Sequence, residues 1–350
     1  MLRPSISIKG REVGSEKPVF IVAEMSANHG QDLDRAVRIL EAAKRAGADA
    51  IKLQTYTPGT MTIRASNEYF RIKGTIWEGR ELYELYGEAF TPWEWQPKLK
   101  DIADSLGLTL FSTPFDHTAV DFLERMEVPA YKIASFELVD LPLLKRIAKT
   151  GKPVVMSTGM ASLAEIDEAV RTLRENGAGQ VALMKCTSAY PASPEEMNLR
   201  TIPHLAEAFG FPVGLSDHTL GSEVAVAAVA LGACIIEKHF TLSREIPGPD
   251  SAFSMEPQEF EEMVKAIRNT EKALGKVSYD ITDHEKSSKV FRRSLFVVRD
   301  VREGEVFSDE NVRSIRPGFG LHTRHLDEVI GRKAKKDISK GTPLAWDLII

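Results

Sequence analysis

The sequence predicts a (β/α)₈ barrel followed by a small β-rich module, and three observations lead to this prediction. Short apolar runs alternate with helical periodicity eight times between residues 19 and 274. The runs are apolar along both faces, which is typical of parallel strands covered by helices. Each run ends in polar residues, at the end where active sites of barrel enzymes lie. An open doubly wound sheet is the alternative, but eight units favour closure and no GxGxxG follows the first strand.

The strands are expected at 19–24, 50–55, 109–114, 130–135, 153–158, 180–187, 211–217 and 234–240. Helices are expected between them, for example at 33–46, 163–174 and 221–231, and a helix at 258–274 follows the last strand. Residues 1–18 read as a short polar hairpin or arm. Capping boxes are predicted to begin at Thr91, Ser162 and Ser193, and single helix caps at Asp116 and Asp140.

The domain boundaries follow from changes in composition. We expect the barrel and its arm at 1–275, a polar linker at 276–290, and a β-rich module at 291–350, where short strands and turns replace the barrel pattern. Hydrophobic residues make up 43% of the chain and charged residues 27%, which is ordinary globular composition.

Charge and hydropathy exclude several classes of protein. The formal net charge of −5 argues against nucleic-acid binding. No apolar run is long enough to span a membrane, and the start of the chain does not resemble a signal peptide. Cys186 and Cys234 lie in apolar runs, which indicates buried free thiols in a reducing compartment. We therefore expect a cytoplasmic protein.

Two histidines stand at the ends of neighbouring strands. The motif GLSDHT at 214–219 ends in His218 and Thr219, and CIIEKHF at 234–240 contains His239. Strands of one strand–helix–strand unit are parallel and close together, so the two imidazoles can meet over one point. Imidazole is a common ligand of divalent transition metals, and the pair therefore predicts a metal site. The alternative is two histidines that are hydrogen-bonded at strand ends.

Two lysines among the polar strand ends indicate an anionic substrate. Lys52 and Lys132 come from separate strands and are accompanied by hydroxyl groups, which suit phosphate or carboxylate oxygens. A surface ion pair is the alternative for either lysine alone. Strict alternation would place Lys132 and Ser135 on opposite faces, so both reach the site only if the strand breaks before Ser135.

The sequence allows two roles for each of two carboxylates, Glu24 and Asp250. Glu24 ends the first strand and could act as a general base, or could be a structural partner of one of the lysines. Asp250 lies in the Pro-, Gly- and Ser-containing segment at 243–257, which is typical of an active-site loop. It could bind sugar hydroxyls or cap its own turn.

Taken together, the motifs resemble those of the sialic-acid synthase family. They are AEMSANHG, IKLQT, FSTPFD, YKIAS, STGM, CTSAYP, GLSDHT, EKHFT and GPDSAFSMEP, and the tail with SLFVVRDVREGE and RPGFGLH resembles the antifreeze-like SAF domain of that family. The resemblance implies condensation of phosphoenolpyruvate with an open-chain amino sugar, to give a nine-carbon 2-keto acid and phosphate. It also implies a divalent metal, usually Mn²⁺ with Co²⁺ or Mg²⁺ as alternatives, and a domain-swapped homodimer in which each SAF domain covers the partner barrel.

The resemblance also assigns roles to individual residues. It implies His218 and His239 as metal ligands, Glu24 as acid/base, and Lys52 and Lys132 as catalytic lysines. Phosphoenolpyruvate would contact Gln54, Thr113, Ser135, Ser157 and Ser216, with Ser188 at a position where sialate synthases usually have Asn. Tyr190 and Asp250 would face the sugar, and Arg316 would enter the active site of the partner.

The loop after Asp250 departs from the sialate pattern. Ser251 and Ala252 replace a His-Lys pair, and Phe253 follows, so the loop is less polar; this loop and the tail resemble the pseudaminic acid synthase branch. A less polar loop suits a 6-deoxy sugar, because a site built to bond a hydroxyl penalises a substrate without one. We therefore expect 2,4-diacetamido-2,4,6-trideoxy-altrose as the aldose, with the aldoses of neuraminate or legionaminate synthesis as alternatives.

Two other classes of function stay open at this stage. One is a Schiff-base aldolase with Lys52 or Lys132 as nucleophile. The other is a non-catalytic sugar-binding protein.

Overall fold

The computed structural model describes residues 4–350. The chain divides into two compact units, Met1–Gly275 and Lys276–Ile350, and each is described by itself.

The first unit is a closed barrel of eight parallel strands, in the order β10-β3-β4-β5-β6-β7-β8-β9. The barrel closes where β10 pairs with β3 and places His239 opposite Glu24. The predicted barrel is therefore confirmed. The strand bounds are β3 (Phe20–Glu24), β4 (Ala50–Thr55), β5 (Thr109–Pro114), β6 (Tyr131–Ile133), β7 (Val154–Ser157), β8 (Val181–Cys186), β9 (Val213–Asp217) and β10 (Ile235–His239).

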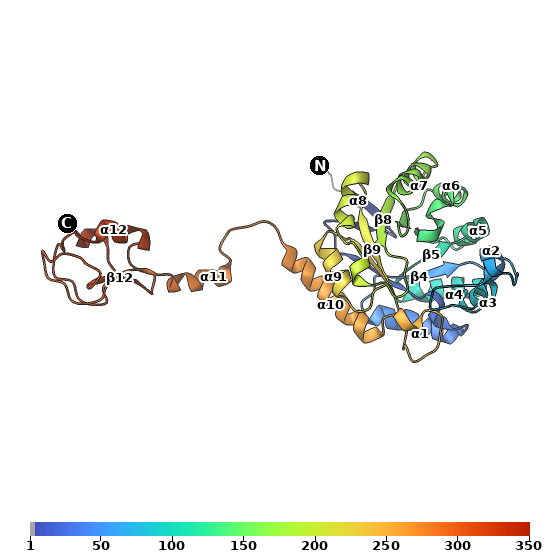
Figure 1. Cartoon of the computed structure of the whole chain (residues 1–350), viewed down its shortest axis with the longest axis horizontal. Coiled ribbons are helices and arrows are strands. Elements are labelled where there is room, and N and C mark those ends of the chain that lie inside the picture. The colour runs from blue at the N-terminus through green and yellow to red at the C-terminus, as the bar shows by residue number, and fades with distance from the viewer. Residues whose placement is uncertain (1–3) are drawn as a thin grey trace. The chain divides into compact units, whose positions relative to one another are not determined.

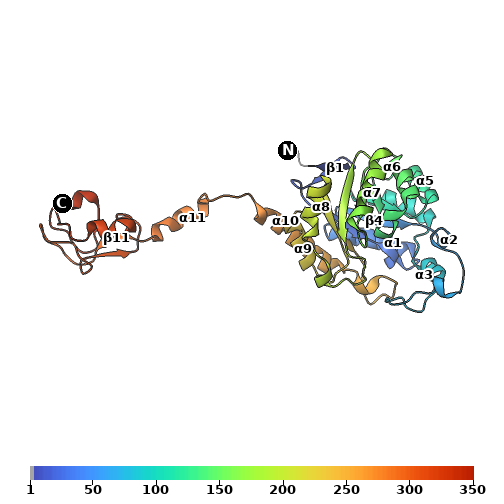
Figure 2. The ribbon, with the colours of Figure 1, turned by 45° about the horizontal axis from the view of Figure 1, so that its top comes forward.

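Helices surround the strands (Figure 1), and their apolar faces form one core with the outer faces of the strands. Their bounds are α1 (Leu33–Arg45), α2 (Pro58–Met61), α3 (Leu82–Ala89), α4 (Gln96–Ser105), α5 (His117–Arg125), α6 (Leu141–Ala148), α7 (Leu163–Glu175), α8 (Thr201–Phe209), α9 (Glu223–Ala230) and α10 (Pro257–Leu274). Figure 2 shows the same ring of helices in a second view. Short 3₁₀ helices lie in the loops: η1 (Ser26–His29), η2 (Glu68–Phe70), η3 (Trp93–Trp95), η4 (Ser135–Val139), η5 (Pro194–Glu196) and η6 (Ser251–Phe253).

Some of the predicted helix caps are confirmed and two are wrong. Ser162 forms the predicted capping box, and Asp116 and Asp140 accept hydrogen bonds from backbone N–H groups of the helices that follow them. The box at Thr91 does not form, because the Thr91 hydroxyl lies 3.1 Å from Nε2 of His29 instead. The box at Ser193 does not form either, because this hydroxyl bonds the carboxylate of Glu195.

A hairpin closes the N-terminal end of the barrel, where the strands begin. Strands β1 (Ser5–Ile8) and β2 (Arg11–Gly14) pair as the sequence predicts, although the hairpin is not simply polar. Ile6, Ile8 and Val13 are buried and join the apolar cluster inside the barrel, which includes Phe20 and Phe111. The interior of the barrel below the carboxyl ends of its strands is therefore filled.

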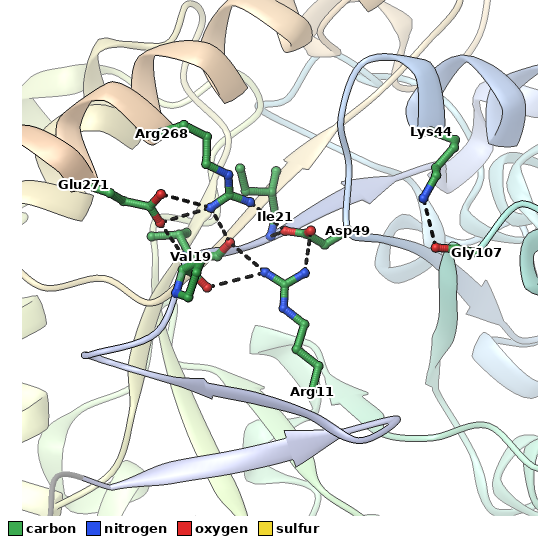
Figure 3. Close-up of polar contacts among 9 residues, drawn as sticks. Arg11, Val19, Ile21, Lys44, Asp49, Gly107, Arg268 and Glu271 are labelled. Carbon is green, nitrogen blue, oxygen red and sulfur yellow. Dashed lines mark hydrogen bonds and ion pairs between the residues drawn. The ribbon is translucent and has the colours of Figure 1, made fainter.

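Charged side chains tie this hairpin to α10 (Figure 3). Asp49 accepts a hydrogen bond from the Ile21 N–H at 2.9 Å and pairs with Arg268 at 3.0 Å and with Arg11. Glu271 of α10 accepts from the Val19 N–H at 2.5 Å. Three segments far apart in the sequence are thereby joined at the end of the barrel where the strands begin.

The second unit is small and has its own core. Strands β11 (Ser294–Val297) and β12 (Val312–Ile315) pair antiparallel, and isolated bridges join other extended segments. Helix α11 (Asp283–Ser288) lies within the stretch that the sequence predicts as linker, and α12 (Leu326–Val329) follows β12. Further 3₁₀ helices are η7 (Lys289–Phe291), η8 (Thr323–His325) and η9 (Trp346–Leu348). The core includes Leu295, Val297, Phe307, Val312, Val329 and Leu344.

Candidate active site

The polar strand ends converge on a small cavity, which we call the deep pocket. Its volume is about 60 Å³. Ten of the predicted site residues line it: Lys52, Gln54, Thr113, Lys132, Ser135, Ser157, Tyr190, Ser216, His218 and His239. Phe115, Ala134, Phe136, Cys186 and Glu237 complete the lining.

Both lysines are buried in this pocket. Lys132 Nζ donates to Ser157 Oγ at 2.6 Å and to the Ile133 carbonyl at 3.0 Å, and Lys52 Nζ lies 3.3 Å from Thr113 Oγ1. Burial lowers the pKa of Lys132 below its ordinary value. Burial also acts to lower the pKa of Lys52, but Glu237 and Glu24 raise it above the ordinary value. Lys52 is therefore a fixed cation, and surface ion pairs do not explain either lysine.

Two buried carboxylates face Lys52. Glu24 Oε2 lies 2.5 Å from Lys52 Nζ, and Glu237 Oε1 lies 3.3 Å from the same atom. Burial raises the pKa of Glu24, and the negative charge of Glu237 adds to this effect against the attraction of Lys52. Burial also acts to raise the pKa of Glu237, but Lys132 and Lys52 bring it below the ordinary value. Of the two carboxylates, Glu24 is the one whose pKa is raised, which is the direction that suits a general base.

Glu237 was not among the predicted site residues. Alternation along β10 places it on the same face as His239, which is the signal that could have identified it. In the barrel, Glu237 is the register partner of Ser216, whose hydroxyl lies 3.3 Å from its carboxylate.

The strand that carries Lys132 ends early enough to admit Ser135. Strand β6 stops at Ile133 and η4 begins at Ser135, so both side chains line the deep pocket. Ser135 Oγ accepts a hydrogen bond from the Gly159 N–H at 3.1 Å. A Cβ atom at Gly159 would lie 2.7 Å from Ser135 Oγ and 2.4 Å from Ser188 Oγ. A side chain at position 159 would therefore displace these hydroxyls, and Ser188, which does not line the deep pocket, lies beside Gly159 together with Ser135.

The two histidines meet as the sequence predicts, with ring centroids 5.4 Å apart. His218 Nδ1 lies 2.8 Å from the Thr187 carbonyl, which leaves its Nε2 as the free donor atom. His239 Nδ1 is buried without a hydrogen-bond partner, and burial holds the pKa of this ring well below its ordinary value. Two imidazoles with free nitrogen atoms fit a divalent ion that keeps open coordination positions. Within residues 4–350, no group of three or more His, Cys, Asp and Glu side chains is arranged to hold a metal.

A second cavity, the outer pocket, adjoins the deep pocket. Its volume is about 320 Å³, and it shares Gln54, Phe115, Ala134, Phe136, Tyr190 and His239 with the deep pocket. Most of its remaining lining comes from residues 56–90: Tyr56, Met61, Ile72, Thr75, Trp77, Leu82, Leu85, Tyr86 and Ala89. Sequence reasoning did not assign this segment to the site. The outer pocket is therefore a mainly apolar and aromatic chamber beside a polar one.

Asp250 supplies a buried carboxylate to the outer pocket. It accepts a hydrogen bond from Ser26 Oγ at 2.5 Å and from the Ala27 N–H at 3.4 Å. Gln54 Nε2 donates to the same Ser26 hydroxyl at 2.8 Å. The alternative that Asp250 caps its own turn is wrong, because its side chain makes no capping bond to η6.

Aromatic rings pack around the histidines. The Tyr190 ring centroid lies 4.4 Å from that of His218 and 5.2 Å from that of Phe253. Phe253 is buried, and its ring centroid lies 5.0 Å from that of His239. The 243–257 segment therefore places an apolar ring at the histidine pair.

Three further expectations concern Arg316, the two cysteines and the whole chain. Arg316 is exposed in the second unit, and its entry into the partner's site stays a prediction. Cys186 and Cys234 are free and buried, as predicted. Across residues 4–350, none of the helices has the combined length and apolar character that crossing a bilayer requires.

Comparison with known proteins identifies the family. The NeuB family model matches residues 39–279, and the SAF domain model matches residues 292–350. A pseudaminic acid synthase of Campylobacter jejuni is 47% identical over 94% of this chain and 96% of its own length. An N,N'-diacetyllegionaminic acid synthase of Legionella pneumophila is 37% identical over 96% of each chain. The crystal structure of the spore coat polysaccharide biosynthesis protein SpsE of Bacillus subtilis has a TM-score of 0.68 at 36% identity and covers 99% of each chain. This chain therefore belongs to the NeuB family and carries a C-terminal SAF domain.

Proposed function

We propose that this enzyme condenses phosphoenolpyruvate with 2,4-diacetamido-2,4,6-trideoxy-altrose and water to give pseudaminic acid and phosphate. The observation that carries this proposal is the pair of adjoining pockets. The deep pocket has two buried lysines and several hydroxyls, which suit a small polyanion, and the outer pocket is large and mainly apolar. The histidine pair stands beside both pockets, where the two substrates would meet.

Phosphoenolpyruvate fits the deep pocket by charge. Lys132 and Ser157 already form a hydrogen-bonded pair that can turn to a phosphate oxygen. Lys52, near Thr113, supplies the second cation for the carboxylate of the substrate. Ser135, Ser216 and Gln54 supply further hydrogen-bonding groups, and Ser188, beside Gly159, would add another contact.

His218 and His239 would hold the divalent metal that the family resemblance implies, with Mn²⁺ as first choice and Co²⁺ or Mg²⁺ as alternatives. When bound there, such an ion acts as a Lewis acid toward an aldehyde oxygen. The unpaired, neutral imidazole of His239 supports this assignment, because metal binding requires an unprotonated nitrogen.

The chemistry proceeds in two stages. The methylene carbon of phosphoenolpyruvate attacks the aldehyde carbon, a carbon–carbon bond forms, and the aldehyde oxygen takes up a proton to become a hydroxyl. The former C2 of phosphoenolpyruvate is then electron-poor. Water adds to it, Glu24 accepts a proton from that water, and the C–O bond to phosphate breaks. Lys132 and Ser157 hold the departing phosphate.

The outer pocket supports a deoxygenated aldose. Asp250 and Gln54 can bond hydroxyl or amide groups of the sugar, and Tyr190 packs beside the histidines. The apolar side chains of residues 56–90 suit the methyl groups of a trideoxy diacetamido sugar. The higher identity to the pseudaminic acid synthase of C. jejuni than to the legionaminic acid synthase of L. pneumophila agrees with this choice.

Phosphate release from phosphoenolpyruvate tests the proposal. The metal-loaded enzyme is assayed with three aldoses: N-acetylmannosamine, the legionaminate precursor and the trideoxy-altrose derivative. We expect turnover mainly with the last. Turnover mainly with another aldose would overturn the substrate assignment, and no turnover with any would overturn the synthase assignment. With bridging-¹⁸O phosphoenolpyruvate, the label must leave in the phosphate, and label retained in the keto acid would contradict C–O cleavage.

A Schiff-base aldolase is the second candidate, and one observation favours it. The lowered pKa of Lys132 makes its amine more available than that of Lys52, which two carboxylates keep protonated. Borohydride trapping of substrate on Lys132, with activity that survives chelation, would support this candidate.

We also propose that the cytoplasmic enzyme acts as a head-to-tail homodimer in which Arg316 completes the site of the other chain. Light scattering tests the dimer. Restored activity on mixing Arg316→Ala with Glu24→Gln chains, each inactive alone, would test the exchange.

A further inference from the structure

The outer pocket is closed on one side by a loop that folds back on itself at residues 71–81. The Ile72 N–H donates to the Arg80 carbonyl, and the Gly79 N–H donates to the Ile72 carbonyl, both at 2.9 Å. Arg71 and Glu81 form an antiparallel bridge at its base. Gly74 and Gly79 have positive φ values of 69° and 84°, which glycine adopts without strain. Backbone hydrogen bonds therefore hold this 71–81 loop in a hairpin-like shape, with residues 73–78 at its tip.

Trp77 lies near that tip and joins it to the loop that follows β10. Its indole Nε1–H donates to the Pro249 carbonyl at 2.9 Å, a contact between residues 172 positions apart. Its ring lies 5.7 Å, centroid to centroid, from Tyr190. Pro249 is the neighbour of Asp250, so Trp77 bridges two loops that both line the outer pocket.

The hydrogen bond determines what Trp77 can offer a ligand. Indole has a single donor and no acceptor, and Pro249 takes that donor. Only the ring carbons remain for the outer pocket. Met61, Ile72, Leu82 and Leu85 line the same pocket and likewise offer a hydroxyl no strong hydrogen-bond partner. Thr75 of the same loop also lines the pocket, and its hydroxyl accepts the Trp77 backbone N–H at 3.2 Å. A hydroxyl directed at the Trp77 ring would lose its bonds to water without replacement, whereas a methyl group would lose nothing.

We propose that Trp77 is a specificity-determining residue, which selects a 6-deoxy aldose by packing its ring against methyl groups of the sugar. This inference rests on the proposed function and identifies the part of the outer pocket that would recognise the substrate. Pro249 holds the ring in place, and Asp250, on the same loop, bonds the polar side of the sugar. Selection then depends on the 71–81 loop as well as on the 250–255 segment.

The test compares two aldoses that differ in one group: 2,4-diacetamido-2,4,6-trideoxy-altrose and the same diacetamido sugar with a 6-hydroxyl. The variants are Trp77→Ala, which removes the ring, and Trp77→Phe, which keeps a ring and loses the bond to Pro249. Tyr69→Ala is the matched control, because this aromatic residue of the same segment is 83% exposed and does not line the pocket. Thermal unfolding confirms that each variant is folded.

We expect Trp77→Ala to lower kcat/KM for the deoxy aldose by about 10- to 100-fold, in the range found for discrimination by one small apolar group. Activity with the 6-hydroxy sugar should fall by much less, so the preference shrinks. Trp77→Phe should lie between Trp77→Ala and the unaltered enzyme. KM for phosphoenolpyruvate at saturating aldose should not change, because Trp77 is absent from the lining of the deep pocket.

The outcomes separate this inference from the proposed function. If the unaltered enzyme prefers the 6-hydroxy sugar, the proposed substrate is wrong and the inference fails with it. If the unaltered enzyme prefers the deoxy sugar but both Trp77 variants keep the full preference, only the role of Trp77 is wrong. An equal loss for both sugars would show that Trp77 merely supports the loop, and this result would also overturn the inference.

Discussion

Replacing Glu24 by glutamine separates proton transfer from substrate binding. The change keeps the shape of the side chain, and the carbonyl oxygen of the new amide can still accept the hydrogen bond that the Ser26 N–H donates at 2.8 Å. What disappears is the basic oxygen and its 2.5 Å ion pair with Lys52. Lys52 keeps Glu237 at 3.3 Å, so no buried charge is left without a partner.

The contacts of Glu24 indicate which effect each part of the side chain contributes, and general ranges give the sizes. Loss of a general base costs about 10²- to 10⁴-fold in kcat, which corresponds to about 2.7–5.4 kcal/mol in the activation barrier. KM for phosphoenolpyruvate should stay level or fall, because Lys52 loses one of two competing carboxylates. The free energy of unfolding should change by less than the roughly 3–5 kcal/mol lost when a buried charge loses its partner altogether.

Steady-state phosphate release, with each substrate varied in turn, measures this split. The matched control is Glu271→Gln at the opposite end of the barrel, where the carboxylate accepts the Val19 N–H at 2.5 Å. That variant should be less stable but should keep its kcat. A Glu24→Gln enzyme with kcat within about tenfold of the unaltered enzyme would refute the role of general base. A rise in KM for phosphoenolpyruvate with unchanged kcat would instead assign Glu24 to binding.

Three other changes have defined outcomes. Asp49→Ala leaves the Ile21 N–H without its acceptor and removes one ion pair each from Arg11 and Arg268. Thermal unfolding should therefore show a loss of about 2–4 kcal/mol and a Tm lower by about 5–15 °C, with kcat/KM unchanged. Burial raises the pKa of Glu137 from 4.5 to about 7. The stabilising contribution of the protonated side chain is therefore present below pH 4.5 and is lost as the pH rises to 7. In urea unfolding, the Glu137→Gln variant should be more stable than the unaltered protein by up to about 3 kcal/mol at pH 8 and little changed at pH 4.5. Ser26 has a φ of 44°, and its hydroxyl donates a hydrogen bond to Asp250. The Ser26→Gly variant loses this bond but keeps the backbone bond to Glu24, so KM for the aldose should rise about tenfold while KM for phosphoenolpyruvate stays constant. Equal rises in both KM values would contradict the assignment of Asp250 to the sugar.

The strand ends could be predicted because their geometry is local. Side chains alternate along a strand, and neighbouring parallel strands end together, which is enough to bring His218 and His239 to one place. Alternation also places Glu237 on the face of His239, but the partners of its carboxylate could not be predicted in this way. Its contacts with Lys52 and Ser216 depend on the register between strands, and nothing in a single strand specifies that register.

Long-range contacts explain the remaining errors and omissions. Thr91 and Ser162 both begin the same four-residue capping pattern, but only Ser162 forms the box, because His29 takes the Thr91 hydroxyl. The outer pocket was missed because residues 56–90 carry no repeating pattern that points to the site. Contacts such as the hydrogen bond between Trp77 and Pro249 position this segment, and contacts between residues so far apart in the sequence cannot be predicted from local patterns.

The filled barrel interior limits the routes by which molecules can reach the deep pocket. The carboxyl ends of the strands and the loops that follow them line the deep pocket, and the apolar cluster with Ile6 and Ile8 fills the barrel below it. The remaining route leads past the six residues that both pockets share. With the substrates placed as proposed, we expect a sugar in the outer pocket to block this route, so that phosphoenolpyruvate binds first and phosphate leaves after the nine-carbon acid. We therefore expect an aldose that binds before phosphoenolpyruvate to inhibit its own reaction.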